Sequence, residues 1–374
     1  MPDPSHATTC CKAAAPCSNP DSIQPLKSLA AILVEQRQPL VVDEVELPAL
    51  DYGQVLVRVH TSRICGSQLG EIDGVKGPDR WLPHLLGHEA GATVLEVGPE
   101  VRHVKSGDRV VCHWRPGRGI EARPAVYTWK GRKLNAGAIT TFQELSVLSE
   151  NRMTAVPPDT DLELCCLLAD TLTTGFGVID NDARLKIGES AVIIGCGGIG
   201  LGVLLGAHLA GACPLVAVDL YDPKLKTAVR YGATHTVNTS KGKLLDEVRR
   251  ILEGSPADVV VDGTGRPEVI ETALELAGPQ GRVIGVGVMP HDRKLSLNTL
   301  PLHFGKILRG SHGGDSRPAE DIPRILRLIR AGRCDPSGFV THRTSLADIN
   351  QAIATMRSGE ANHTIIHFPE SAGP

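Results

Sequence analysis

The chain lacks a strong excess of charge of either sign. Its 374 residues include 39 Lys and Arg against 42 Asp and Glu, which gives a formal net charge of -3. Without a large positive balance, the global charge gives no reason to expect a nucleic-acid partner. Apolar residues make up 41% and charged residues 22%, as in ordinary globular proteins, and the length leaves room for two domains.

The sequence also lacks the features of a secreted or disulfide-stapled protein. Ten cysteines in 374 residues are too few for a disulfide framework. The segment from Met1 to Asp21 has no charged start followed by an apolar core, so it does not read as a signal peptide. We therefore expect a cytoplasmic protein whose thiols are mostly free.

The first residues show no periodic pattern. The stretch 1–24 is rich in Ala, Ser, Pro and Cys, which is typical of a disordered extension. Cys10, Cys11 and Cys17 are potential metal ligands, but no companion His or Cys group lies at finger-like spacing. A tail without a metal site is the preferred interpretation.

One uncharged run, from Ala191 to Val218, is long enough to suggest a membrane span. Its glycines, however, fall where a nucleotide-binding turn needs them, and Asp219 ends the run. We predict a buried strand, turn, helix and second strand in this run, and no membrane partner.

The patterning predicts two kinds of domain. Before about Pro157, segments such as Gly53–Val59, Ala92–Val97 and Gly107–Val111 read as strands bounded by turn residues, which indicates a β-rich domain. From about Lys186, strands alternate with helices, which indicates a doubly wound parallel sheet. The strands are expected at Ala191–Gly195, Leu215–Asp219, Asp258–Asp262 and Gly281–Val286, and the helices at Leu244–Leu252 and Val269–Leu276.

The last part of the chain has two amphipathic helices, Ile322–Ile329 and Leu346–Met356, and a final strand, His363–Phe368. We expect this part to return to the first domain. The predicted division is an extension at 1–24, a β-rich domain at 25–178, a nucleotide-binding domain at 179–312 and the return segment at 313–374.

A glycine-rich turn follows the first strand of the second domain. In Gly195-x-Gly197-x-x-Gly200, completed by Gly198 and Ile199, the glycines allow a tight turn and close approach of the backbone to a pyrophosphate at a helix N-terminus. Asp219 lies nineteen positions after Gly200, at the end of the next strand. A carboxylate there binds a ribose 2′-hydroxyl and repels a 2′-phosphate, so NAD is predicted over NADP. The alternative role for Asp219 is a cap for the helix starting near Pro223.

A second set of residues offers metal ligands. Cys65, His88 and Asp170 supply a thiolate, an imidazole and a carboxylate, which zinc accepts in a tetrahedral site with one position open for substrate. A metal beside a nicotinamide indicates alcohol oxidation or carbonyl reduction. Taken singly, each residue has an ordinary alternative: a buried apolar Cys, a surface or core His, and a helix-capping Asp.

The motifs around these residues resemble a known signature. Gly87-His88-Glu89-Ala90-Gly91, Val97-Gly98 and Gly107-Asp108-Arg109-Val110 occur in the order of the zinc signature of the medium-chain dehydrogenase/reductase superfamily. The resemblance extends from about Leu29 to Phe368. It implies a GroES-like catalytic domain, a Rossmann domain that binds NAD, and a catalytic zinc in the cleft between them. We also expect a homodimer or homotetramer.

The resemblance assigns roles to individual residues. Cys65 and His88 match the first two zinc ligands, and Asp170, which precedes Thr174-Gly175-Phe176-Gly177, falls in the third position, where many members have Cys and some have Asp. Glu89 matches an acid that joins the metal in some members when substrate is absent. Two further matches are Ser67, to the hydroxyl that passes the alcohol proton toward solvent, and Lys224, to a contact of the adenosine ribose.

Three departures from the family pattern stand out. Gln68 replaces the acid that usually supports the metal-binding histidine, and Gly70 stands where some members have a relay histidine. The region 113–142 contains no cysteine, so Cys112 alone cannot hold the structural zinc that many members carry, and we predict one zinc per subunit. The same region is basic, which indicates either a site for an anionic substrate or a solvated loop; its charged residues are Arg115, Arg118, Arg123, Lys130, Arg132 and Lys133 against Glu121.

The sequence thus predicts a zinc-dependent, NAD-linked dehydrogenase of a small-molecule alcohol of secondary, polyol or cyclitol type. Two alternatives remain. One is a zinc-free quinone or enoyl reductase of the same superfamily, and the other is a non-catalytic nucleotide-binding protein on the same scaffold.

Overall fold

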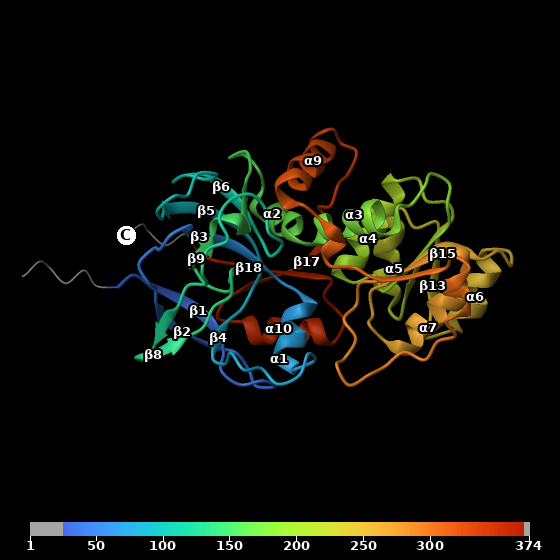
Figure 1. Cartoon of the computed structure of the whole chain (residues 1–374), viewed down its shortest axis with the longest axis horizontal. Coiled ribbons are helices and arrows are strands. Elements are labelled where there is room, and N and C mark those ends of the chain that lie inside the picture. The colour runs from blue at the N-terminus through green and yellow to red at the C-terminus, as the bar shows by residue number, and fades with distance from the viewer. Residues whose placement is uncertain (1–24, 370–374) are drawn as a thin grey trace, which may run out of the picture.

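A computed structural model describes residues 25–369, which form three β-sheets with helices around them (Figure 1). A five-stranded sheet has the order β4-β1-β2-β7-β8. Its strands are β1 (Lys27–Leu33), β2 (Val41–Glu46), β4 (His84–Leu85), β7 (Tyr127–Trp129) and β8 (Arg132–Leu134).

The second sheet has seven strands and carries most of the site. Its order is β10-β6-β5-β3-β18-β17, and β9 also pairs with β3. Because β3 is central, it is buried on both faces along most of its length, and the alternation expected for its first half is only faint. The strands are β3 (Gln54–Ile64), β5 (Glu89–Val97), β6 (Arg109–His113), β9 (Leu145–Ser149), β10 (Met153–Ala155), β17 (Val340–Ser345) and β18 (His363–His367).

The third sheet is parallel throughout, in the order β13-β12-β11-β14-β15-β16. Its strands are β11 (Ala191–Ile194), β12 (Leu215–Asp219), β13 (His235–Asn238), β14 (Ala257–Asp262), β15 (Ala277–Gly285) and β16 (Ile307–Gly310). The helices that follow the strands are α4 (Gly198–Leu209), α5 (Asp222–Arg230), α6 (Leu244–Ile251) and α7 (Pro267–Leu276). The predicted fold class, a β-rich domain joined to a doubly wound parallel sheet, is confirmed.

The uncharged run Ala191–Val218 divides into β11, α4 and most of β12, the strand, turn, helix and strand predicted for it. A different segment, Leu162–Ala183, is long and apolar enough to cross a membrane by composition, but 83% of its most apolar window is buried inside the protein. It consists of α2 (Leu162–Ala169), α3 (Thr171–Gly177) and a π-helix at Val178–Ala183, with a break at Asp170. Burial against α4 and the sheets identifies it as a core segment, because lipid would face an exposed span.

The remaining helices include α1 (Gly66–Asp73), α8 (Leu300–His303), α9 (Pro318–Arg330) and α10 (Ile349–Arg357), with short 3₁₀ turns at Glu150–Arg152 and Gly313–Asp315. After α9 the chain comes back to the seven-stranded sheet, where β17 pairs with β18 and β18 pairs with β3. This pairing brings His363 to the end of β3, next to Cys65. The domain boundaries themselves stay a prediction.

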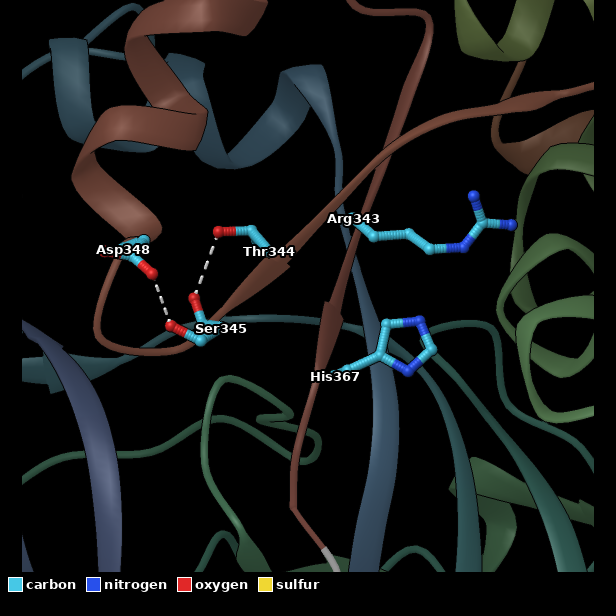
Figure 2. A pocket seen from close by; sticks show the side chains of 5 residues that line it. All are labelled: Arg343, Thr344, Ser345, Asp348 and His367. Atoms are coloured by element: carbon cyan, nitrogen blue, oxygen red, sulfur yellow. Dashed lines mark hydrogen bonds between the residues drawn. The ribbon is translucent and has the colours of Figure 1, made fainter.

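A surface hollow lies beside β17 and β18 (Figure 2). Arg343 and His367 line it, but both are already paired with the carboxylate of Glu163, at 2.6 and 2.7 Å. Since that carboxylate offsets their charge, the hollow is a poor place for an anionic ligand.

Candidate metal and dinucleotide site

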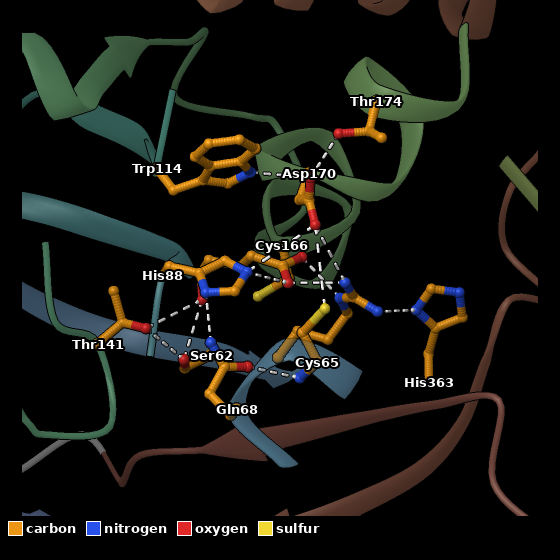
Figure 3. Close-up of polar contacts among 12 residues, drawn as sticks. Ser62, Cys65, Gln68, His88, Trp114, Thr141, Cys166, Asp170, Thr174 and His363 are labelled. Carbon is orange, nitrogen blue, oxygen red and sulfur yellow. Dashed lines mark hydrogen bonds and ion pairs between the residues drawn. The ribbon is translucent and has the colours of Figure 1, made fainter. Parts of the chain in front are cut away.

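Four side chains from separate parts of the chain meet at one point (Figure 3). Cys65 follows β3 at the N-cap of α1, His88 and Glu89 stand at the start of β5, and Asp170 lies at the break between α2 and α3. Their potential ligand atoms all lie within 4.8 Å of one another. The structure thus brings together the four residues that the sequence offered for the zinc site, while Cys10, Cys11 and Cys17 lie outside the described residues.

The distances suit a single ion. The Sγ of Cys65 is 4.0 Å from the Oδ2 of Asp170, and the Nε2 of His88 is 3.9 Å from the same oxygen. Ordinary zinc–ligand bonds at a tetrahedral angle would set such pairs about 3.4–3.6 Å apart, so a shift of a few tenths of an ångström completes the site. Cys65 and Asp170 are buried, and His88 is partly exposed, which leaves an approach for substrate.

Electrostatics favour a cation here. Burial would lower the pKa of His88, but hydrogen bonds with Asp170, Cys65 and Glu89 raise it well above its ordinary value. Burial would raise the pKa of Asp170, but the hydrogen bond and charge of His88 and the charge of Arg63 hold it below its usual range. Acidic groups gathered in a buried site therefore favour positive charge, which a metal ion can supply in place of the His88 proton.

Glu89 is bound by a residue that the sequence analysis missed. The Nε and Nη2 atoms of Arg63 donate to its two carboxylate oxygens at 2.6 and 2.7 Å, and both side chains are buried. Glu89 Oε1 also lies 3.3 Å from His88 Nε2. Glu89 would have to leave Arg63, at least in part, to bind a metal. The sequence did carry a signal for Arg63: it is a charged residue inside an otherwise buried strand, two residues before Cys65.

The same Arg63 connects the metal ligands with the glycine-rich turn. Its Nη1 lies 3.1 Å from the Nδ1 of His363, and both side chains lie close beneath Gly198, where an added Cβ would be 2.8 Å from Arg63. Within residues 25–369, the Nε2 of His363 has no hydrogen-bond partner although the side chain is buried. Periodicity could not indicate this role for His363, because it depends on the pairing of β18 with β3.

The turn itself has the shape that its glycines predict. An added Cβ at Gly200 would be 1.8 Å from the carbonyl oxygen of Gly195, so only glycine fits where α4 packs against the turn. At Gly197, the N-cap of α4, an added Cβ would meet no atom of the described chain within 4 Å, which leaves the backbone open to a ligand. Gly198 and Ile199 form the first turn of α4, whose free N–H groups favour an anion.

Asp219 stands at the end of β12 beside this turn. Its carboxylate accepts the backbone N–H groups of Cys196, Leu220 and Tyr221 at 2.8, 2.7 and 3.0 Å. A carboxylate has room for about four such bonds, so one acceptor position remains for a ribose hydroxyl. The alternative role as a helix cap is wrong, because Tyr221 occupies the N-cap of α5. The ammonium group of Lys224 lies over the ring of Tyr221, 5.2 Å from its centroid.

Two residues after Cys65, Ser67 has a buried hydroxyl without a hydrogen-bond partner in the described part of the chain. The hydroxyl therefore does not serve local backbone groups. Gln68 accepts the backbone N–H of Cys65 at 2.8 Å and places its amide nitrogen against the Nδ1 of His88. Gly70 offers no titratable group, so a proton relay through this position is absent.

The basic region does not form one patch. Arg115 lies near the site, but its Nη1 is 2.6 Å from the Nδ1 of His312 and its Nε donates to the carbonyl of Ser316 at 3.3 Å. Lys130, by contrast, pairs with Asp43 at the β2–β7–β8 edge of the five-stranded sheet, on the side away from the parallel sheet (Figure 1). A common anion-binding role for all six cations is therefore not supported.

Comparisons with known proteins agree with this geometry. A family model described as "Alcohol dehydrogenase GroES-like domain" matches residues 51–158, and one described as "Zinc-binding dehydrogenase" matches residues 198–331. The "Alcohol dehydrogenase class-3" of Cereibacter sphaeroides is 30% identical over 377 residues, covering 92% of this chain and 100% of the relative. The "S-(hydroxymethyl)glutathione dehydrogenase" of Paracoccus denitrificans is also 30% identical, with the same coverage.

A solved structure with a similar fold is described as an alcohol dehydrogenase zinc-binding domain protein from Burkholderia ambifaria. It superposes with a TM-score of 0.84 at 27% identity and covers 93% of this chain and 100% of its own. The predicted resemblance and the zinc and NAD cofactors that it implied are in line with these matches. The chain belongs to the zinc-dependent alcohol dehydrogenase family of the medium-chain dehydrogenase/reductase superfamily.

Proposed function

We propose that this protein is an NAD-linked alcohol dehydrogenase whose single zinc is held by Cys65, His88 and Asp170. The observation that carries the proposal is the meeting of these ligand atoms, all within 4.8 Å, next to a glycine-rich turn. When bound, zinc supplies Lewis acidity that makes an alcohol hydroxyl more acidic. One thiolate and one carboxylate balance its two charges, so an anionic substrate oxygen is not repelled.

The protein groups would divide the remaining tasks. Ser67 would pass the alcohol proton toward solvent, taking up that proton as its hydroxyl releases its own to water, since the hydroxyl is buried and without a partner among residues 25–369. Arg63 and His363, beneath Gly198, would add positive charge and a hydrogen bond to the anion-binding end of α4. Glu89 would hold Arg63 in place and join the metal only when substrate is absent.

The preference for NAD rests on Asp219. Its carboxylate lies at the turn and keeps one acceptor position, which suits a ribose 2′-hydroxyl and opposes a 2′-phosphate. Lys224 would contact the adenosine ribose from the first turn of α5. We also propose a cytoplasmic homodimer or homotetramer; the cysteines between residues 25 and 369 are all free thiols, in keeping with a reducing compartment.

For substrate we propose a secondary alcohol, polyol or cyclitol. The name of the Paracoccus denitrificans relative adds a second candidate, the alcohol adduct S-(hydroxymethyl)glutathione. That adduct carries carboxylates, and Arg118 has an exposed guanidinium that could bind one. Arg115 is less available, because His312 and Ser316 already engage it.

A single purified preparation tests the proposal. Elemental analysis should find one zinc per chain, and turnover with NAD should be seen with at least one member of a panel of secondary alcohols, polyols, cyclitols and S-(hydroxymethyl)glutathione. A zinc-free protein after zinc-replete expression would favour the quinone or enoyl reductase. A zinc-loaded protein that binds NAD but turns over nothing in the panel would favour a non-catalytic role.

A further inference from the structure

Asp170 divides its two carboxylate oxygens between two kinds of partner (Figure 3). Its Oδ1 accepts hydrogen bonds from the indole Nε1 of Trp114 at 3.0 Å and from the hydroxyl of Thr174 at 2.5 Å. Its Oδ2 instead faces the other ligands, 4.0 Å from the Sγ of Cys65 and 3.9 Å from the Nε2 of His88. One oxygen is thus fixed by protein donors and the other is presented to the metal position.

The backbone does not fix Asp170 by itself. The residue lies between α2 and α3 with φ -148° and ψ -55°, outside the helical region. It occupies the N-cap of α3, yet its side chain makes no capping hydrogen bond, so the helix-cap alternative considered from the sequence is wrong. The orientation of the carboxylate therefore depends on its side-chain partners: Trp114 and Thr174 bind Oδ1, and the Nη2 of Arg63 lies 3.7 Å from Oδ2.

Trp114 is itself held firmly by its neighbours. Its ring meets His312 edge-on, with centroids 5.0 Å apart, and the guanidinium of Arg115 lies 5.7 Å from its centroid. Gly313 lies against the indole so closely that an added Cβ would be 2.6 Å from its Cζ2. Two of these neighbours, His312 and Gly313, come from the segment that follows the parallel sheet.

We propose that Trp114, together with Thr174, is a positioning residue that makes Asp170 a one-oxygen ligand of the catalytic metal. This inference rests on the proposed metal site. Two donors on Oδ1 prevent the carboxylate from turning to offer both oxygens, which keeps the fourth position of a tetrahedral ion open for the alcohol. Trp114 belongs to the cysteine-free region 113–142, so that region supports the site through an indole N–H.

The chain offers a matched control for this test. Trp129 donates its Nε1 to the Oδ2 of Asp43, also at 3.0 Å, on β7 in the five-stranded sheet and away from the metal ligands. Trp114→Phe and Trp129→Phe therefore remove the same indole–carboxylate hydrogen bond in two places. Trp114→Phe also keeps an aromatic ring against His312 and Gly313.

Zinc affinity should be measured by competition with a chromophoric chelator, and the coordination of cobalt by the visible absorption of the Co²⁺-substituted protein. Trp114→Phe should weaken zinc binding by about 10- to 100-fold, the usual effect of losing an outer hydrogen bond to a metal ligand. It should also change the visible absorption bands of the Co²⁺-substituted protein to those of a higher coordination number. Trp129→Phe should leave both readouts as in the wild type. Thr174→Val, which removes the other Oδ1 donor, should act in the same direction as Trp114→Phe.

The outcomes separate this inference from the proposed function. If the wild-type protein binds no zinc, the metal proposal itself fails. If the wild type binds zinc and both Trp114→Phe and Thr174→Val match it in affinity and cobalt spectrum, the positioning role is overturned. If Trp114→Phe does not fold, the test rests on Thr174→Val. Unchanged zinc affinity and an unchanged cobalt spectrum in Thr174→Val would then show that the hydrogen bonds to Oδ1 do not control metal binding.

Discussion

Gln68 contacts both Cys65 and His88, and in the metal-bound state its amide oxygen can accept a hydrogen bond from only one of them. Its oxygen accepts the backbone N–H of Cys65 at 2.8 Å, so its nitrogen points at the Nδ1 of His88. The Nε2 of His88 faces the other ligands. Zinc binding through Nε2 needs a proton on Nδ1, which would then meet an N–H group instead of an acceptor.

Replacing Gln68 by Glu should therefore strengthen metal binding. A carboxylate of the same length offers one oxygen to the backbone N–H of Cys65 and the other to Nδ1–H of His88. We expect zinc affinity to rise by about tenfold, the lower end of the effect of such supporting groups. Competition with a chelator measures it, and Gln68→Met, which offers no acceptor to Nδ1–H, should not reach the zinc affinity of Gln68→Glu. Equal affinity in all three proteins would show that the amide is not mismatched.

Cys65→Ser should lose both zinc and activity while the fold survives. The seven-stranded sheet and the parallel sheet have their own apolar cores, and Cys65 serves the site and not the packing. Elemental analysis measures the loss of zinc, and circular dichroism checks that the fold survives. Cys213→Ser is the control, because Cys213 is exposed and lies before β12, in the parallel-sheet part of the chain. Full zinc content in Cys65→Ser would remove this residue from the ligand set.

Asp219→Ser should narrow the preference for NAD over NADP. We expect the wild type to favour NAD by at least about tenfold, because a repulsive or unpaired contact costs roughly 1.4 kcal/mol or more. The ratio of kcat/KM for the two cofactors measures this. Asp222→Ser is the matched control, since Asp222 is a nearby exposed acid paired with Lys241. A wild-type enzyme that prefers NADP would show that Asp219 does not contact the ribose.

The sequence was most informative where chemistry is carried by short motifs. Gly195 to Gly200 and the pair His88-Glu89 could be placed from their neighbours alone, and the parallel sheet followed from the alternation of strands and helices. A short polar element was missed: β13 reads His-Thr-Val-Asn, which has no apolar run. Periodicity cannot detect such elements, because it needs several apolar residues on one face.

The parts of the site that depend on long-range packing were beyond the sequence. Arg63 and His363 lie 300 positions apart and meet only because β18 pairs with β3. Trp114 reaches Asp170 across 56 positions through the turn after β6. No local pattern encodes these contacts, so the ligands were predictable while the groups that orient them were not.

The lowered pKa of His113 should make the free energy of unfolding depend on pH. It is fully buried in β6, where its ring nitrogens are 2.7 Å from the carbonyl of Arg115 and 2.8 Å from the hydroxyl of Thr154. Burial lowers the pKa of His113 from its model-peptide value of 6.5 to about 4. Between these values the unfolded chain binds a proton that the folded chain does not, so the free energy of unfolding falls as pH drops from 6.5 toward 4.

Urea unfolding at pH 7.5 and pH 5 should therefore show that the free energy of unfolding is lower at pH 5, and His113 should cause this loss. A drop to pH 5 crosses about 1.5 pH units of this window, which corresponds to about 2 kcal/mol at 1.36 kcal/mol per unit. His113→Asn cannot titrate and should be less stable than the wild type at pH 7.5, but the difference should shrink by about that amount at pH 5. His303→Gln, at an exposed position, should keep the pH dependence of the wild type. A constant difference between His113→Asn and the wild type at both pH values would show that His113 is protonated in the fold as readily as in the unfolded chain.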